Sequence, residues 1–147
     1  MKNKIVSIFA LLTFSTTIAI AAEEPCKPTK HANVPTITNF TYHKARSALL
    51  KAGWQPVQTK SHNMVSEDPD VSSGNGAEFW GKGYIEVESC SGTGVAACAF
   101  LFKDIYSNKL RVVTAGEEDS KLKAFALVSG FNFVCTPLVT PCESGAE

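Results

Sequence analysis

This chain has no excess of positive or negative charge, no catalytic signature and no metal-binding pair of histidines. Fourteen lysines and arginines balance fourteen aspartates and glutamates, and no basic stripe is visible, which argues against a nucleic-acid partner. The serine-nucleophile pattern G-x-S-x-G does not occur. None of the histidines, His31, His43 and His62, has a partner four residues away, as a helical zinc site requires. We therefore expect no metal, no cofactor and no catalytic residue that a local pattern could identify.

Long apolar runs are also missing, except at the N-terminus. Met1 to about Ala21 reads as a secretory signal, with Lys2 and Lys4 before an apolar stretch that ends in the A-x-A cleavage pattern Ala19–Ala21. Three threonines and a serine interrupt the stretch, so it would make a poor permanent membrane anchor. The sequence thus predicts a bacterial protein that is periplasmic or secreted, with no integral membrane segment after signal removal.

Removal of this signal would leave 126 residues, enough for one domain with its own core. It would also leave 12 basic against 14 acidic residues, a net charge of −2. We divide the chain into the signal 1–21, a mobile lead-in 22–33, a single α+β domain 34–135 and an irregular C-terminal tail 136–147.

All five cysteines lie beyond the predicted signal, and an oxidising compartment would let four of them pair. Cys90 and Cys98 flank a turn with two glycines, and they form the disulfide that we favour. Cys135–Cys142 is the second choice, with Cys26–Cys142 or Cys26–Cys135 as rivals. Spacing cannot decide the connectivity or the fate of the fifth cysteine.

The stretch from Gly83 to Thr114 predicts three antiparallel strands joined by two turns. In the first strand, Ile85, Val87 and Ser89 alternate with Tyr84, Glu86 and Glu88, the pattern of a half-buried strand. Ala97–Lys103 follows the glycine turn, and Leu110–Thr114 follows a second turn around Ser107.

One helix is expected, over Tyr42–Ala52, with Thr41 or Asn39 as its N-cap. Gly53 follows it as a left-handed C′ residue, and Trp54 could fold back onto the helix. His43 lies off the expected buried stripe, so it should be an ordinary surface histidine. The stripe recurs at helical spacing: Ala45, Ala48, Leu49 and Ala52.

The rest of the chain adds further strands and loops. We predict an α+β fold in which one main helix packs on a twisted antiparallel sheet of four to six strands, stapled by disulfides. The remaining segments are assigned as follows: a short edge strand Val34–Ile37, a strand Gln55–Lys60, a polar loop Ser61–Gly76, an acidic loop Ala115–Asp119, one or two helical turns in Lys121–Ala126, and a last strand Val128–Cys135 with Phe131, Phe133 and Cys135 on one face.

Two near-motifs lie in or beside the polar loop. The acidic segment 67–74 places oxygens at Asp68, Asp70 and Ser72, as a calcium loop does. Its glycine comes one residue late and Phe79 stands where the final glutamate belongs, so a solvated acidic loop is favoured and calcium binding stays open. Residues 76–83 resemble a phosphate-binding loop, except that Gly83 replaces the magnesium-binding serine or threonine.

Two resemblances cover parts of the chain. Val34–Val57, which starts with Val-Pro and contains an Ala-rich segment ending in Ala-Gly, resembles the opening of a PASTA domain. PASTA domains occur outside bacterial cells on penicillin-binding proteins and receptor kinases and are associated with cell-wall muropeptides. The resemblance implies a strand–helix–strand start. Beyond Val57 the chain departs from the pattern, because a PASTA module is shorter and has no cysteine-bearing hairpin.

The chain as a whole resembles small exported proteobacterial proteins of unknown function. The shared pieces are Ala52-Gly53-Trp54, the Cys-x-Gly-Thr-Gly…Cys-x-Phe hairpin from Cys90 to Phe100, and the strand end Leu110 to Gly116. This resemblance implies a fold and no activity.

Glu78, Trp80 and Tyr84 are the candidate ligand-binding residues, because aromatic and polar side chains near a loop often bind proteins or glycans. The alternative is ordinary core packing at the start of a strand. We therefore expect a non-catalytic binding or inhibitory module for a protein or cell-envelope ligand. The alternatives are a thiol-dependent or hydrolytic enzyme and a structural envelope component.

Overall fold

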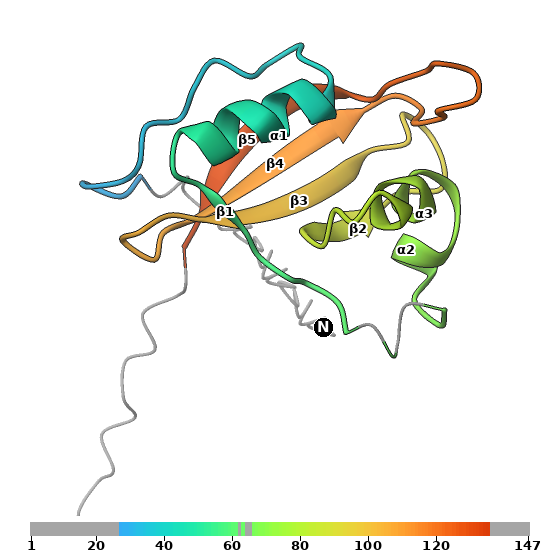
Figure 1. The fold of residues 1–147 in the computed structure, drawn as a ribbon, viewed down its shortest axis with the longest axis horizontal. Coiled ribbons are helices and arrows are strands. Elements are labelled where there is room, and N and C mark those ends of the chain that lie inside the picture. The colour runs from blue at the N-terminus through green and yellow to red at the C-terminus, as the bar shows by residue number, and fades with distance from the viewer. Residues whose placement is uncertain (1–26, 62, 64–65, 136–147) are drawn as a thin grey trace, which may run out of the picture.

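A computed structural model describes residues 27–61, 63 and 66–135 of the chain. The predicted signal 1–21, residues 22–26 of the lead-in and the tail 136–147 lie outside the described residues. The described part contains one main helix against a five-stranded antiparallel sheet (Figure 1), which confirms the predicted α+β fold.

The sheet is built around the hairpin of β3 (Cys98–Lys103) and β4 (Lys109–Ala115). β5 (Leu127–Val134) pairs with the other side of β4, with a register shift between Val113 and Thr114. Two short strands, β1 (Gln55–Pro56) and β2 (Val87–Cys90), both pair with the side of β3 that faces away from β4. Every pairing is antiparallel, and the short turns between β2 and β3 and between β3 and β4 require this for two of the four pairs.

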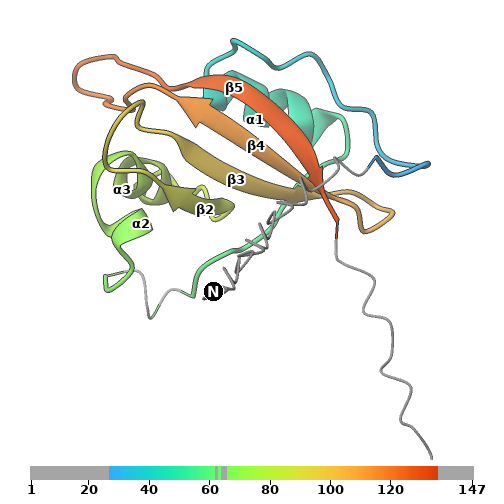
Figure 2. The ribbon, with the colours of Figure 1, turned by 180° about the vertical axis from the view of Figure 1, so that it is seen from behind.

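Helix α1 (Tyr42–Lys51) lies across one face of the sheet, and the view from behind in Figure 2 shows β3, β4 and β5 in front of it. Thr41 caps its start by accepting a hydrogen bond from the Lys44 N–H. Its end follows the predicted pattern, because Gly53 has φ +93° and the Trp54 N–H donates to the Leu49 carbonyl at 3.0 Å. Trp54 is thereby buried in the core.

The core fills the space between α1 and the sheet. Alternate residues of β3 and β4 are buried, as expected for strands with one covered face. The largest fully buried side chains include aromatic residues from four different segments: Tyr42, Trp54, Phe79, Phe100 and Phe102. The β5 face that was predicted to carry Phe131 and Phe133 is only partly covered. Phe133 packs against the core, whereas Phe131 is 41% exposed.

Two helices replace most of the second half of the predicted polar loop. Helix α2 (Pro69–Ser72) begins at Asp68, whose side chain accepts from the Asp70 N–H. Helix α3 (Gly74–Gly81) follows directly, and it contains Phe79 as a buried core residue. The loop assignment for residues 69–76 was therefore wrong. The glycine at position 76, which suggested a loop, instead allows α3 to pack against α2. A Cβ atom there would lie 1.8 Å from the Asp70 carbonyl oxygen.

Three smaller assignments also differ from the structure. Residues 34–37 form no strand, so the strand–helix–strand start implied by the PASTA resemblance is present only from its helix onward. The predicted strand 55–60 has only two paired residues, in β1. Residues 121–126 are not helical, because Asp119 and Ala124 form a β-bridge that closes a turn.

The Cys90–Cys98 disulfide is formed, between residues that lie directly opposite each other in β2 and β3. Cys135 is also disulfide-bonded, and the two partners considered for it, Cys26 and Cys142, lie outside the described residues. Within the described ranges, no helix combines the length and apolar character that crossing a bilayer takes.

Candidate functional site

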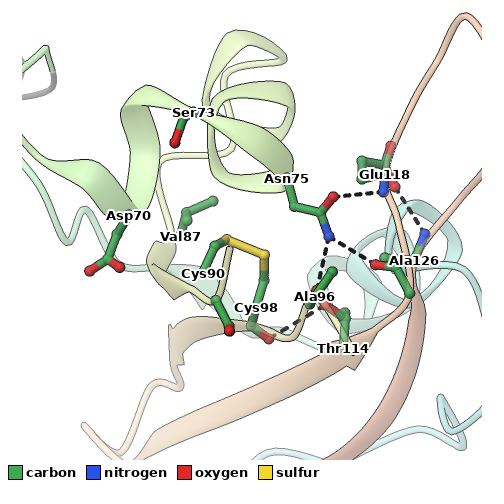
Figure 3. The surroundings of a disulfide bond; sticks show 12 residues. Asp70, Ser73, Asn75, Val87, Cys90, Ala96, Cys98, Thr114, Glu118 and Ala126 are labelled. Atoms are coloured by element: carbon green, nitrogen blue, oxygen red, sulfur yellow. Dashed lines mark hydrogen bonds between the residues drawn. A yellow bond between two sulfur atoms is a disulfide. The ribbon is translucent and has the colours of Figure 1, made fainter. Parts of the chain in front are cut away.

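The site begins with a buried carboxylate, Glu118, in the loop between β4 and β5. Its position is set by Asn75, in the first turn of α3, whose side-chain oxygen accepts from the Glu118 N–H at 2.8 Å (Figure 3). The Asn75 amide group donates to the carbonyls of Ala96 and Gly116, which joins α3 to the turn between β2 and β3 and to the residue after β4. Glu118 is only 2% exposed. The fold therefore holds a carboxylate in its interior instead of on an acidic surface loop.

Both oxygens of Glu118 accept hydrogen bonds. Oε1 contacts His43 Nε2 at 2.8 Å and Lys82 Nζ at 2.9 Å, and Oε2 accepts from the Ala126 N–H at 3.1 Å. His43 comes from α1, Lys82 is the residue after α3, and Ala126 is the residue before β5. Lys82 Nζ and the Ala126 N–H can only donate, so each oxygen of Glu118 acts as an acceptor. We therefore assign the proton of the His43–Glu118 hydrogen bond to His43 Nε2.

His43 extends this chain of hydrogen bonds to Tyr84. Its second ring nitrogen, Nδ1, lies 2.8 Å from the Tyr84 hydroxyl. With the proton on Nε2, the neutral imidazole has a free lone pair on Nδ1, so the Tyr84 O–H donates to it. The result is a chain from Tyr84 through His43 to Glu118, made by residues from three separate segments.

A second buried carboxylate, Glu86, lies beside this chain. Glu86 is fully buried, and its Oε1 accepts from the Tyr42 hydroxyl at 2.8 Å and from Arg46 Nε at 2.5 Å. The Arg46 guanidinium also stacks over the Tyr84 ring, with Cζ 4.4 Å from the ring centroid. Tyr84 is thus held at both ends, by His43 at its hydroxyl and by Arg46 at its ring.

The outer parts of these side chains reach solvent. The side chains of His43, Arg46 and Lys82 are 28%, 21% and 27% exposed, and Tyr84 is half-buried. Phe125 is 42% exposed and meets the His43 ring edge to face at 5.5 Å. We call these five residues, His43, Arg46, Lys82, Tyr84 and Phe125, the His43–Tyr84 surface.

The two carboxylates shift the pKa values of their neighbours. Burial disfavours charge on Lys82, but the hydrogen bond and charge of Glu118 outweigh it, and the pKa of Lys82 is raised. Arg46 is likewise desolvated, and Glu86 keeps its pKa above the ordinary value. Burial, followed by the charge and hydrogen bond of Glu86, raises the pKa of Tyr42 well above the usual value for tyrosine. Both cations stay charged and Tyr42 stays neutral across the physiological range.

The structure connects two of the three residues predicted to bind a ligand. Tyr84 belongs to the His43–Tyr84 surface, and Glu78 is joined to it through Lys82 Nζ at 3.4 Å. Trp80 is half-buried and packs against the core. Glu78 and Trp80 lie on α3. Trp80 and Tyr84 are both half-buried, so neither is fully exposed or fully buried.

Sequence reasoning missed the surroundings of three residues of the site. His43 was expected to be an ordinary surface histidine, yet both of its ring nitrogens are hydrogen-bonded. Glu86 was assigned to the polar face of a strand, but the strand starts only at Val87 and Glu86 is buried. Glu118 lies in the predicted acidic loop, but its burial was not foreseen. No local pattern indicated this burial, because Glu118 meets Asn75 across 43 positions and His43 across 75.

The other candidate binding sites show less evidence of a ligand-binding arrangement. A pocket of about 390 Å³ lies between the Gly92–Gly94 turn and the start of α3, and Asn75, a buried polar side chain in its lining, already makes three hydrogen bonds. In the acidic segment, Asp68 and Asp70 face Lys60 Nζ at 2.6 and 3.6 Å. Among the residues that the structure describes, no group of three or more His, Cys, Asp or Glu is arranged to hold a metal ion.

Comparison with known proteins adds no identity to this geometry. The chain matches no protein-family model, no curated protein and no solved structure. Function must therefore be argued from the His43–Tyr84 surface itself.

Proposed function

We propose that this protein is an exported, non-catalytic module that binds a cell-envelope ligand through the His43–Tyr84 surface. The observation that carries the proposal is the support beneath this surface. Its cationic and aromatic side chains are partly exposed, and each contacts a buried carboxylate or a neighbouring ring that holds it in position. A buried carboxylate is costly unless it is paired and hydrogen-bonded, and here the partners include side chains that reach solvent.

Such support favours binding because it reduces the entropy that a ligand contact costs. A free lysine or arginine side chain loses roughly 1.5 to 2 kcal/mol of rotamer freedom when it is fixed. Arg46 is already bonded to Glu86 and stacked on Tyr84, and Lys82 is already bonded to Glu118. A ligand that meets these groups would find them close to their bound positions.

The kind of ligand follows from the exposed groups. Tyr84, Phe125 and the His43 ring offer aromatic surface with polar edges, which suits sugar rings and peptide groups, and Arg46 and Lys82 add hydrogen-bond donors. Peptidoglycan is therefore the first probe.

The thiol-dependent enzyme is the weaker alternative. Cys90, Cys98 and Cys135, the cysteines within the described ranges, are all disulfide-bonded. Such an enzyme would have to use Cys26 or Cys142. We therefore place the binding module first.

Sedimentation with purified peptidoglycan sacculi tests the proposal. Phe125→Ala removes the most exposed ring of the surface, and Phe131→Ala is its matched control, because the two rings are 42% and 41% exposed. We expect Phe125→Ala to weaken co-sedimentation about tenfold, the effect of one aromatic contact residue, and Phe131→Ala to leave it unchanged. Absence of wild-type binding, or equal losses in the two variants, would contradict the proposal.

A further inference from the structure

The chain from Tyr84 through His43 to Glu118 reverses one of its hydrogen bonds when His43 gains a proton. In the neutral state Nε2–H donates to Glu118 and Nδ1 accepts from the Tyr84 hydroxyl. In the charged state both ring nitrogens carry protons and can only donate. Nδ1–H must then donate to the Tyr84 oxygen, and the Tyr84 O–H has to turn to another acceptor. Histidine side chains typically change charge between about pH 5 and 8.

The groups around His43 make this reversal possible without breaking the network. Glu118 in the β4–β5 loop accepts from His43 in both states. Lys82, after α3, shares the same carboxylate oxygen and opposes a second positive charge. Tyr84 and the ring of Phe125 complete the contacts.

Further charges lie one step away from His43. Glu78 contacts Lys82, and Arg46 pairs with Glu86 above Tyr84. With His43 neutral, the network holds the carboxylates of Glu78, Glu86 and Glu118 against only two cations, a net charge of −1. One proton on His43 brings it to neutrality.

We propose that the Tyr84 hydroxyl is the group that contacts the ligand, and that protonation of His43 frees its O–H to donate to an acceptor oxygen of that ligand. At higher pH the same hydrogen is engaged by His43, and Tyr84 can only accept. The ligand group is therefore a carboxylate or carbonyl oxygen, bound more strongly in mildly acidic conditions. The inference rests on the proposed function for its ligand, but the reversal itself is a property of the chain alone.

The first experiment needs no ligand. Nitrogen-15 spectra of histidine-labelled protein report which ring nitrogen carries the proton, with His31 as an internal reference. In spectra recorded between pH 8 and pH 5, the neutral form of His43 should carry its proton on Nε2, and the charged form should be protonated on both nitrogens. The Tyr84→Phe variant should keep the Nε2–H form but shift the Nδ1 resonance, because the donor to Nδ1 is gone. A neutral His43 with its proton on Nδ1 would overturn the proposal.

The second experiment measures co-sedimentation with peptidoglycan sacculi at pH 5.5 and pH 8. We expect wild type to bind roughly two- to tenfold more strongly at pH 5.5, the range that one net hydrogen bond produces. Tyr84→Phe should bind equally at both values, since it keeps the ring under Arg46 and loses only the hydroxyl. Tyr106→Phe, at an exposed tyrosine that also carries a cation over its ring, from Lys30, is the matched control and should behave as wild type. A pH dependence that survives in Tyr84→Phe would overturn the role of Tyr84.

The two experiments separate the failures. If wild type binds no sacculi at either pH, the proposed function is contradicted while the nitrogen-15 spectra still decide the reversal. If sacculi with amidated carboxyl groups lose the acidic preference, the acceptor is a carboxylate. If the preference remains, the acceptor is a carbonyl oxygen.

Discussion

Glu86 and Glu118 are both buried under half-exposed cations, yet they differ in how completely they are bonded. Glu118 uses both oxygens, with His43, Lys82 and the Ala126 N–H as donors, and its own N–H is bonded to Asn75. Glu86 collects both of its donors, Tyr42 and Arg46, on one oxygen. Within the described residues, its Oε2 is buried without a hydrogen-bond partner.

This difference indicates separate roles for the two carboxylates. A buried group with every bond made holds its neighbours in one arrangement, because any other arrangement leaves a charge unpaired. Glu118 therefore acts as the fixed point of the His43–Tyr84 surface. Glu86 has a spare acceptor, so its surroundings can change without breaking a bond at that oxygen. The comparison predicts that the fold depends more on Glu118 than on Glu86.

Removal of the Glu118 carboxylate should have the largest effect. Glu118→Ala leaves His43, Lys82 and the Ala126 N–H without their acceptor, and loss of one partner in a buried ion pair costs about 3 to 5 kcal/mol in the free energy of unfolding. Urea unfolding followed by tryptophan fluorescence measures it. Glu117→Ala, one residue earlier and exposed, is the control and should change stability by less than about 0.5 kcal/mol. A loss below about 1 kcal/mol for Glu118→Ala would remove its role as the fixed point.

Replacement by glutamine compares the two carboxylates directly. Glu118→Gln must place its NH₂ group against His43 and Lys82 or against the Ala126 N–H, so two donors meet wherever it lies. Glu86→Gln can keep its oxygen toward Tyr42 and Arg46 and place the NH₂ group where Oε2 has no donor. We expect losses of about 3 kcal/mol for Glu118→Gln and about 1 kcal/mol for Glu86→Gln, from the cost of unsatisfied buried donors. Equal losses in urea unfolding would show that the two sites are bonded equivalently.

The parts of this molecule that sequence reasoning recovered depend on neighbours in the chain. Thr41, Gly53 and Trp54 mark the ends of α1 because helix caps are local patterns. The alternation in β3 and β4 and the Cys90–Cys98 pair across a short turn are local in the same sense. These signals were sufficient for the α+β fold and the hairpin disulfide.

The site depends on contacts that no local pattern contains. His43 meets Glu118 across 75 positions and Tyr84 across 41. Helix α3 was missed because its glycines suggest a loop, whereas Gly76 serves the close approach to α2. Of the three predicted ligand residues, Tyr84 was found for its ring alone, and nothing near it in the sequence indicated that its hydroxyl would be bonded to a histidine.

Alkaline pH should lower the free energy of unfolding through Tyr42, the tyrosine that is bonded to Glu86. Burial and Glu86 raise the pKa of Tyr42 in the folded protein, while in the unfolded chain it deprotonates near pH 10. The folded state therefore resists losing this proton, and the free energy of unfolding should fall as pH rises above about 10. Tyr42→Phe should reduce this slope in urea unfolding between pH 8 and 11, whereas Tyr106→Phe should keep it. The raised pKa of Lys82 acts in the same direction, so part of the slope should remain in Tyr42→Phe. An unchanged slope would mean that burial and Glu86 do not raise the pKa of Tyr42 in the folded protein.

The smallest effect is expected at Glu78, the exposed neighbour of Lys82. Its side chain is 43% exposed and lies 3.4 Å from Lys82 Nζ, one helical turn away, and exposed pairs of this kind contribute roughly 0.3 to 0.5 kcal/mol. Glu78→Gln should therefore change stability by no more than this in urea unfolding, and a double-mutant cycle with Lys82→Met should give a coupling of the same size. A coupling above about 1 kcal/mol would mean that Lys82 needs both carboxylates, which would extend the fixed arrangement around Glu118 to the surface of α3. If Glu78→Gln instead keeps full stability and loses sacculus binding, Glu78 contacts the ligand directly, because the variant removes a charge without disturbing the side chains beneath it.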